Sequence, residues 1–522
     1  MALSHAERSD QPKKACWTPG CSWKRCLKYM KSVSIIIVFA FGFTGIPSAQ
    51  EVQGLKALRS DLESIISDSS FSNAFIGIEV KDLKSGEILF AYNQDKDFVP
   101  ASNMKLLTTS TALSILGENY QYHTYLMANG YVLDDTLFGD LYIVGSGDPT
   151  ISGRFTNGDV VKVFKGWADT LKLLNVKVVK GNVIGDDRVF DNVPVGGGWG
   201  LAWHEDVYWY AAYISGLSFN DNCVDVTLKP GKQGAPASYT LDPSTSYVTV
   251  VNESRTTDDT VSTVDFYRDP ATNVIHIYGN YPKTLDSMKV SLTIYNPTLY
   301  TATVLFETLN SAGIKLTGRP FDISGYRSIS RVPPYNLMWT IASYTSPPLS
   351  EIVKVVNKRS QNFYAEQIFR TLGKEKYGIG TFENARKVEM SFLYSIGVDT
   401  TKIEINDGSG LSSWDLVTPH AIVKILEAMR KSPVWESFYS SLPVAGVDGT
   451  LEFRMKGTRA QGNVRGKTGF IENVRSLSGY LTTLDGDPIA FSIFVNHYTV
   501  PTSAVNALQD MICTRLCNFS YK

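Results

Sequence analysis

The most informative segment of this 522-residue chain reads Pro100-Ala-Ser-Asn-Met-Lys-Leu-Leu-Thr-Thr109. It holds the single Ser-x-x-Lys of the sequence, formed by Ser102 and Lys105. Residues three apart on a helix share a face, so the Lys105 amine can reach the Ser102 hydroxyl. Serine is a poor nucleophile until a base takes its proton, and a desolvated lysine can be that base. The segment therefore predicts an activated serine at the start of a helix that reaches about Leu116.

Two shorter motifs follow along the chain. Ser360-Gln-Asn362 joins a hydroxyl that can relay a proton to an amide that can hold a carbonyl, although a helix cap also explains such a triplet. Lys467-Thr-Gly469 sets a cation beside a hydroxyl on an expected strand, which suits a substrate that ends in a carboxylate. Its glycine lets another backbone approach closely. The rival triplet Lys84-Ser-Gly86 lies in an expected hairpin turn.

The pattern around these motifs changes twice. A helix over 51–67, a hairpin over 74–92 and the helix after Ser102 come first. Short β-type runs with turns extend from about 120 to 331, and helical segments over 350–372 and 382–396 and strands over 476–496 follow. This order predicts an α+β fold in which a large β-rich insertion of one or two nested domains interrupts one domain. The expected division is an N-terminal extension and signal peptide at 1–49, a catalytic domain at 50–118 and 335–522, and inserted domains at 119–334.

The N-terminus has the pattern of an export signal. Basic residues at 24–31 precede the apolar run Val33–Phe43, and small residues follow up to Ala49. The run is about half the roughly 20 residues that a spanning helix needs, which favours a cleaved signal. An uncleaved signal anchor is the alternative. A start at Met30 would give a signal of ordinary proportions, so we expect translation to begin there. The expected location is outside the cytoplasm, in the periplasm, as a soluble or loosely membrane-associated protein.

Composition argues against several classes of function. The chain has 50 Lys and Arg against 51 Asp and Glu, a net charge of −1, and no basic run in its main body, which argues against a nucleic-acid partner. No Gly-x-Ser-x-Gly elbow and no His-x-x-x-His pair occur, which disfavours a Ser-His-Asp hydrolase and a metallopeptidase. Beyond the leader, Cys223, Cys513 and Cys517 form neither a disulfide framework nor a metal-ligand set. The sequence predicts no metal and no cofactor.

In the order Ser-x-x-Lys, Ser-x-Asn and Lys-Thr-Gly, the three motifs are the signature of penicillin-recognising serine acyl enzymes. The chain resembles the D-alanyl-D-alanine carboxypeptidase/endopeptidase family of penicillin-binding proteins, the penicillin-binding protein 4 (DacB) type of peptidase family S13. The resemblance runs from about residue 75 to 496. Besides the first motif, its matching stretches are Gly139–Thr150, Lys358–Glu366, Asp407–Ser412, Leu442–Thr450 and Gly466–Gly469.

The resemblance implies a β-lactamase/transpeptidase-like domain and an acyl-transfer reaction. Ser102 is the implied nucleophile, Lys105 its base, and Ser360 and Asn362 form the second motif. The implied substrates are peptidoglycan stem peptides, cleaved as a DD-carboxypeptidase, a DD-endopeptidase or both. β-Lactams are the implied covalent inhibitors.

The third motif has an implied role in binding. Lys467 and Thr468, followed by Gly469, would hold the terminal D-alanine carboxylate. The backbone N–H groups of Ser102 and Phe470 would form the oxyanion hole.

Two positions depart from the family pattern. Ser413 stands where an arginine is usual after Asp-Gly-Ser-Gly-Leu-Ser. Phe470 stands where a serine or threonine is usual after Lys-Thr-Gly, and Glu472 follows two residues later. The missing arginine charge at Ser413 and the added negative charge of Glu472 would weaken recognition of a diaminopimelate carboxylate, if the side chains at these two positions face the substrate and not solvent. Asp148 is a further candidate, either to hold a substrate amine or as a turn residue before proline.

Other functions stay open at this point. The chain is alternatively a serine β-lactamase, if deacylation is fast, or a non-catalytic cell-wall-binding relative. A homo-oligomer is also compatible with the sequence. The aromatic residues Trp199, Trp203, Tyr208, Trp209 and Tyr210 of the insertion suit either sugar stacking or an ordinary core.

Overall fold

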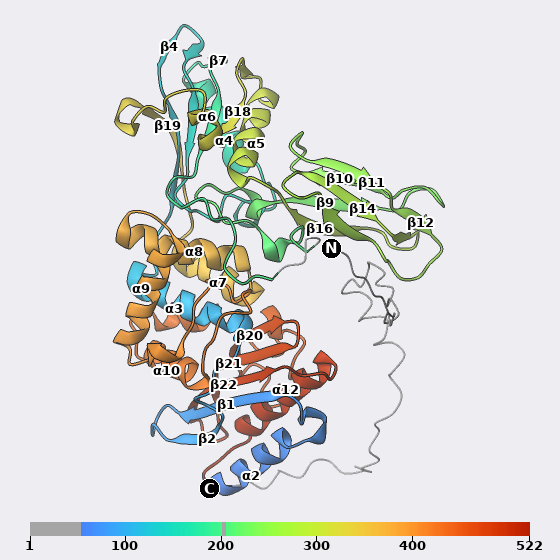
Figure 1. Cartoon of the computed structure of the whole chain (residues 1–522), viewed down its shortest axis with the longest axis vertical. Helices are drawn as coiled ribbons and strands as arrows, with labels where there is room; N and C mark the ends of the chain where they lie inside the picture. Colours follow the sequence, from blue (N-terminus) through green and yellow to red (C-terminus); the bar gives the residue numbers. More distant parts are fainter. Residues whose placement is uncertain (1–53, 201–204) are drawn as a thin grey trace, which may run out of the picture.

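A computed structural model describes residues 54–200 and 205–522. The first and last parts of the chain share one five-stranded antiparallel sheet, called the main sheet below, in the order β2-β1-β22-β21-β20 (Figure 1). Strand β22 is buried along nearly its whole length, because helices cover both faces of the sheet. The strands are β1 (Phe75–Asp82), β2 (Ile88–Tyr92), β20 (Arg465–Ile471), β21 (Val474–Thr482) and β22 (Pro488–Asn496).

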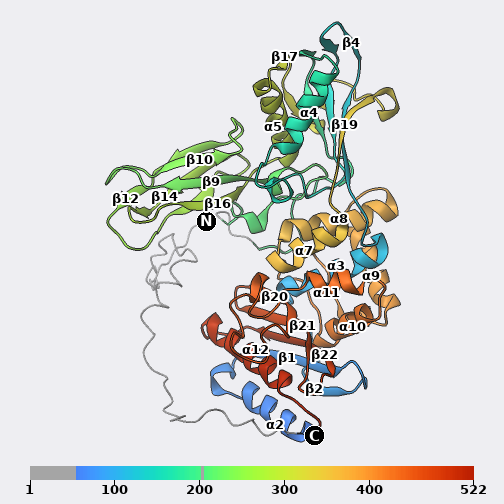
Figure 2. The ribbon, with the colours of Figure 1, turned by 180° about the vertical axis from the view of Figure 1, so that it is seen from behind.

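Two helices cover one face of the main sheet and a larger group covers the other. The helices α2 (Leu55–Ile66) and α12 (Thr502–Cys517) pack against each other and share a core with the sheet, in which Cys513 and Cys517 are buried (Figure 2). The helix α3 (Met104–Leu116) lies among the helices of the other face and is buried on all sides of its first ten residues. The other members of this group are α7 (Leu349–Arg359), α8 (Asn362–Tyr377), α9 (Phe382–Ser395), α10 (Pro419–Arg430) and α11 (Trp435–Ser441).

The segment from His123 to Thr345, called the insert below, leaves and returns on neighbouring strands. Strand β3 (His123–Ala128) pairs antiparallel with β19 (Trp339–Thr345), so that His123 faces Thr345. The ladder therefore extends past residue 334, where the sequence places the end of the inserted domains.

The insert forms two lobes at the end of the molecule away from the C-terminus (Figure 1). One lobe has the sheets β18-β8-β6-β3-β19 and β17-β7-β5-β4 with three helices. Its other elements are β4 (Tyr131–Leu133), β5 (Thr136–Phe138), β6 (Leu141–Val144), α4 (Lys162–Leu173), β7 (Val178–Lys180), β8 (Val183–Asp186), α5 (Pro297–Ser311), β17 (Lys315–Leu316), β18 (Pro320–Asp322) and α6 (Ile323–Arg327).

The second lobe is built from small sheets alone. Their orders are β10-β9-β16, β11-β14-β13 and β12-β15, and one hydrophobic core continues from this lobe into the first. Its strands are β9 (Cys223–Lys229), β10 (Ser238–Asp242), β11 (Thr249–Asn252), β12 (Arg255–Thr257), β13 (Asp265–Arg268), β14 (Val274–Tyr278), β15 (Asn280–Pro282) and β16 (Met288–Thr293).

The helical segment expected over 350–372 is in fact two helices. Ser360 has a left-handed backbone with φ of 55°, which ends α7 and redirects the chain before α8 begins at Asn362. A serine in this conformation is uncommon, and sequence periodicity carries no signal for it.

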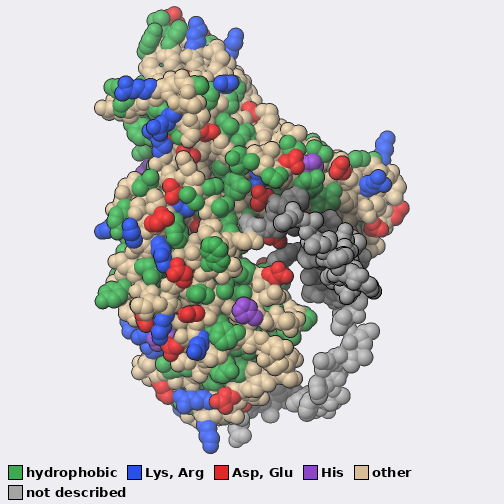
Figure 3. All heavy atoms as spheres, in the orientation of Figure 1, with side chains coloured by type: hydrophobic (Ala, Val, Ile, Leu, Met, Phe, Trp, Pro, Cys, Tyr) green, Lys and Arg blue, Asp and Glu red, His purple; other side chains and the backbone are tan. Residues whose placement is uncertain are grey.

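The expected signal peptide at 1–49 and Trp203 lie outside the described residues. Within residues 54–200 and 205–522, none of the helices has the length and apolar character needed to cross a bilayer. Side chains of both charges are interspersed over the face seen in Figure 3, in line with the balanced composition.

Candidate active site

The Ser-x-x-Lys motif lies at the junction of a short 3₁₀ turn and helix α3. Ser102 belongs to the turn Ala101–Asn103, and Lys105 follows in the first turn of α3. The Lys105 Nζ donates a hydrogen bond of 2.9 Å to the Ser102 Oγ. Ala101 has φ of 47°, a strained conformation for a residue with a Cβ, directly before the serine.

Lys105 is completely buried, because α3 is a central helix. Its Nζ also donates to the Asn362 Oδ1 at 2.7 Å and to the Ser409 carbonyl at 2.5 Å. Burial lowers the pKa of Lys105 to about 7, although the carboxyl groups of Asp407, Glu366 and Asp415 act in the opposite direction. An amine with a pKa near neutrality is suited to general base catalysis.

The second motif lies between α7 and α8. The turn at Ser360 places its hydroxyl beside the third motif, and Asn362 is the first residue of α8. The Asn362 amide accepts from Lys105 and donates from Nδ2 to the Tyr210 carbonyl of the insert at 2.9 Å. The insert thus fixes the orientation of this amide.

The third motif lies on the edge strand β20. The Lys467 Nζ donates to the Ser360 Oγ at 2.9 Å and to the Thr468 carbonyl at 2.7 Å. The Thr468 Oγ1 donates to the Thr450 Oγ1 at 2.7 Å. Burial, and next the charge of Lys105, lower the pKa of Lys467 well below its ordinary value. A bound carboxylate would offset this cost by supplying the missing negative charge.

Strand β20 runs against the segment that carries Ser102. The Asn103 Nδ2 donates to the Lys467 carbonyl at 3.0 Å, and a Cβ added to Gly469 would lie 2.8 Å from the Pro100 carbonyl oxygen. Only glycine allows this approach. Phe470 follows on the same strand, opposite Arg475 of β21, and its ring lies under the Arg475 guanidinium at 3.9 Å.

Hydrogen bonds join Ser102, Lys105 and Asn362 in one set and Ser360 and Lys467 in a second set, and Lys467 also feels the charge of Lys105. The structure thus brings these five residues from three parts of the chain into one site. Two of the proposed specificity residues lie at its edges. Ser413 is exposed and its backbone N–H donates to the Gly198 carbonyl of the insert at 3.1 Å. Glu472 is exposed in the turn between β20 and β21.

Asp148 lies apart from these residues, in the insert. It follows Gly147, whose carbonyl accepts a hydrogen bond from Gln367 of α8. It is buried, and its Oδ1 accepts from both the backbone N–H and the hydroxyl of Thr150. Burial raises the pKa of Asp148 to about 6, and the Thr150 hydrogen bonds act in the opposite direction. These are the contacts of a local turn.

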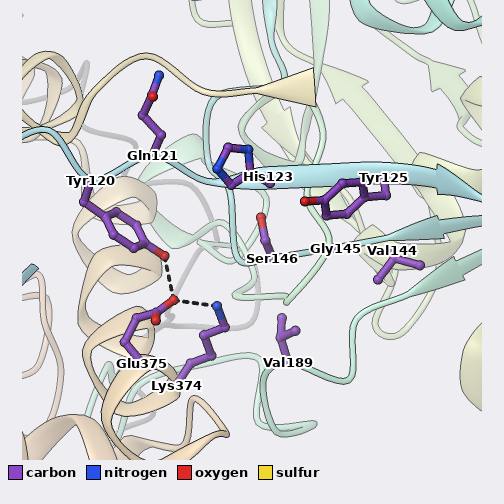
Figure 4. A pocket seen from close by; sticks show the side chains of 10 residues that line it. All are labelled: Tyr120, Gln121, His123, Tyr125, Val144, Gly145, Ser146, Val189, Lys374 and Glu375. Carbon is purple, nitrogen blue, oxygen red and sulfur yellow. Dashed lines mark hydrogen bonds and ion pairs between the residues drawn. The ribbon is translucent and has the colours of Figure 1, made fainter. Parts of the chain in front are cut away.

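A cavity of about 340 Å³ lies where this same insert segment meets α8 (Figure 4). The Tyr120 hydroxyl and the Lys374 ammonium both donate to the Glu375 carboxylate at its edge, so these polar groups bind one another. Gly145 and Ser146, just before Asp148, line its opposite side.

Several residues of the site have no signal of their own in the sequence. Ser409 and Tyr210 contribute backbone carbonyls, and Trp199 donates from its indole Nε1 to the Asp407 Oδ2 at 3.0 Å. Asp407 and Thr450 belong to matched stretches, but spacing alone assigns them no task. In the part of the chain that the structure describes, no group of three or more His, Cys, Asp or Glu is arranged to bind a metal ion.

The chain is similar to known proteins over nearly all of its length. It is 32% identical over 490 residues to the D-alanyl-D-alanine carboxypeptidase of Actinomadura sp. (strain R39), covering 91% of this chain and 87% of that protein. It is 26% identical over 435 residues to the D-alanyl-D-alanine carboxypeptidase DacB of Haemophilus influenzae, covering 81% of this chain and 86% of that protein.

The fold has a solved counterpart. The crystal structure of penicillin binding protein 4 (dacB) from Haemophilus influenzae matches with a TM-score of 0.75 at 22% identity, over 88% of this chain and 99% of that one. This similarity confirms the predicted fold class. Residues 58–516 match the family described as D-Ala-D-Ala carboxypeptidase 3 (S13). The chain belongs to the D-Ala-D-Ala carboxypeptidase 3 (S13) family.

Proposed function

We propose that this chain is an exported serine DD-peptidase that cleaves peptidoglycan stem peptides through an acyl-serine intermediate and is inhibited by penicillins. The observation that carries the proposal is the 2.9 Å hydrogen bond between the buried Lys105 Nζ and the Ser102 Oγ. Family membership supplies the substrate class, since the relatives are named D-alanyl-D-alanine carboxypeptidases.

In the proposed acylation step, neutral Lys105 takes the Ser102 proton as Oγ attacks the carbonyl carbon of the D-Ala-D-Ala bond. The backbone N–H groups of Ser102 and Phe470 stabilise the oxyanion. The C–N bond then breaks, and the proton that Lys105 took from Ser102 passes through the Ser360 hydroxyl to the leaving amine. Lys105 is neutral again, and an ester is left on Ser102.

Water completes the reaction: neutral Lys105 takes a proton from the water that attacks the ester carbonyl, and this proton passes to the Ser102 oxygen as the ester C–O bond breaks and the shortened peptide is released. Lys467 and Thr468 have the donors needed to hold the terminal carboxylate during acylation, and Gly469 leaves room for the substrate backbone along β20. A β-lactam would react by the same attack, but its leaving nitrogen stays tethered to the adduct.

The proposal is tested by incubating the purified protein with a fluorescent penicillin and locating the adduct by peptide mass. A stable label on Ser102 is expected, absent in Ser102→Ala and present in the matched control Ser85→Ala, whose serine lies in the hairpin turn of the rival triplet. Label that is lost within seconds would indicate a β-lactamase. A folded protein that takes no label would indicate a cell-wall-binding relative.

Export is tested separately on protein from the native cell. We expect the mature chain to begin near residue 50 by intact mass and to be found in the periplasm. Tryptic peptides from residues 1–29 would contradict a translation start at Met30.

A further inference from the structure

Asp407 organises the loop that lies beneath the catalytic lysine. This side chain is fully buried, and its Oδ1 accepts from the backbone N–H groups of Ser409 at 3.0 Å and Gly410 at 2.5 Å. Its Oδ2 accepts from the Ser412 N–H at 2.8 Å. One carboxylate thus binds three N–H groups that no helix or sheet could satisfy.

The loop is pressed against the segment that carries the nucleophile. Gly410 has φ of 76°, and a Cβ there would lie 1.8 Å from the Ala101 carbonyl oxygen. In this position the Ser409 carbonyl accepts from the Lys105 Nζ at 2.5 Å. The conformation imposed by Asp407 therefore fixes one of the three acceptors of the lysine amine.

Asp407 also carries charge in a cluster of buried acids. Burial is the main cause that raises the pKa of Glu366 to about 8 and the pKa values of Glu389 and Asp415 well above the ordinary range. The Asp407 carboxylate favours the protonated form of Lys105, against the effect of burial. Two cations also act on these groups: the charge of Arg370 opposes the rise in the pKa of Glu366, and Lys467 and Lys105 repel each other.

The insert completes the environment of this carboxylate. The Trp199 Nε1 donates to the Asp407 Oδ2 at 3.0 Å, and the neighbouring Gly198 carbonyl accepts from the Ser413 N–H. Both contacts come from the glycine-rich segment of the insert, so one carboxylate joins the insert to the loop beneath Lys105.

We propose that Asp407 is a positioning residue that holds the Ser409 carbonyl against the Lys105 amine and stabilises the positive charge that Lys105 gains from the Ser102 proton. The inference rests on the proposed function, because it needs Lys105 to act as the base. In this step the Ser102 O–H bond breaks and an N–H bond forms on Lys105. Asp407 takes no proton and acts through its charge and its hydrogen bonds.

The test is the pH dependence of the acylation rate by a penicillin in the wild-type protein, Asp407→Asn and Glu389→Gln. Without the Asp407 charge, protonated Lys105 is less stable, so we expect the acid limb of the profile to move about one pH unit lower. We also expect the plateau rate to fall about 10- to 100-fold, because the lysine is misplaced and less basic. Glu389→Gln exchanges a buried acid, whose pKa burial raises well above its ordinary value, for an uncharged amide and should keep the wild-type limb.

A milder variant keeps the inference testable if Asp407→Asn does not fold. Trp199→Phe removes one of the donors that hold the Asp407 carboxylate in place, so the Ser409 carbonyl should support protonated Lys105 less well, and the acid limb should move in the same direction by a smaller amount. An unmoved limb in both variants overturns the inference, as does an unmoved limb in Trp199→Phe when Asp407→Asn does not fold. Failure of the wild-type protein to be acylated would instead overturn the proposed function.

Discussion

Burial determines the chemistry of the two lysines at the site. Lys105 and Lys467 are both fully buried, and in both cases burial is the main cause that lowers the pKa. Their partners differ: Lys105 contacts a nucleophilic hydroxyl and Lys467 contacts Ser360 on the expected carboxylate-binding side. In the proposed mechanism the same physical effect would suit Lys105 to act as the base, and would make the charge of Lys467 depend on an anionic substrate.

Lys105→Arg tests whether acylation needs residue 105 to accept a proton, because arginine keeps the positive charge. A guanidinium keeps the hydrogen-bond donors but does not lose its proton at neutral pH, so we expect acylation by penicillin to slow by about 10²- to 10⁴-fold. The rate of adduct formation measures this, with Lys84→Arg in the hairpin turn as the control. A decrease of less than threefold would show that Lys105 is not the base.

Ser413→Arg tests the proposed change in side-chain recognition. Ser413 is exposed, and it lies beside Gly198 of the insert at the edge of the site. A guanidinium there should bind a free diaminopimelate carboxylate, so we expect kcat/KM for such a peptide to rise about tenfold relative to its amidated form. An equal effect on both peptides would mean that this position faces away from the substrate.

At the scale of elements, helix α10 is joined to the main sheet by a buried acid. Thr418 caps the helix through a hydrogen bond from the Ala421 N–H, and His420 in the first turn binds the Glu79 Oε2 of β1 through Nδ1 at 2.8 Å. The hydrogen bond to Glu79 raises the pKa of His420 above its ordinary value. The helix–sheet contact thus depends on pH.

The sign of this dependence follows from the raised pKa. Protonated His420 stabilises the folded state fully below about pH 6.5, the unfolded value, and this contribution is lost as pH rises through the folded pKa. His420→Gln keeps a donor but no charge, so the melting temperature should fall below wild type by more at pH 6 than at pH 9. An equal difference at both pH values would contradict this assignment.

The sequence predicts most elements but not the break at Ser360. Residues 357–362 are all polar and a helix cap is one interpretation of the Ser360 triplet, but residue type alone does not specify the left-handed backbone that turns the serine toward Lys467. The three motifs identify the side chains that meet at the site. The carbonyls of Ser409 and Tyr210 were beyond prediction, because a backbone group joins the site through tertiary packing and not through its residue type.

At the scale of the whole molecule, the insert is held to the helical region by side chains from α8. Arg370 is nearly fully buried, and its Nη1 binds both oxygens of Asp191 at 2.8 and 3.0 Å while its Nη2 donates to the Val193 carbonyl. Gln367, one turn earlier, donates to the carbonyls of Gly147 and Ser215. The insert segments near the site are therefore positioned by the same helix that carries Asn362.

Arg370→Met should loosen this attachment. The substitution leaves the half-buried Asp191 carboxylate without its ion-pair partner, and the glycine-rich segment after Asp191 loses its anchor. Hydrogen exchange should therefore increase over residues 191–199 and stay unchanged in β21 and β22. Unchanged exchange over 191–199 would show that other contacts hold the segment.

The pairing of β1 with β22 has a consequence for the order of folding during synthesis. Phe75 of β1 lies opposite Asn496 of β22, and β22 also pairs with β21, so the main sheet joins the two ends of the chain. A chain that is made from its N-terminus, and threaded across a membrane if it is exported as proposed, presents β1 long before its partner β22 exists. The insert can close its own ladder between β3 and β19 in the meantime. Until the last strands emerge, β1 and β2 form a sheet edge that is open to wrong partners. Ser102 and the Lys467-Thr-Gly469 motif also stay apart until then. The enzyme can therefore acquire activity only when its synthesis is almost complete.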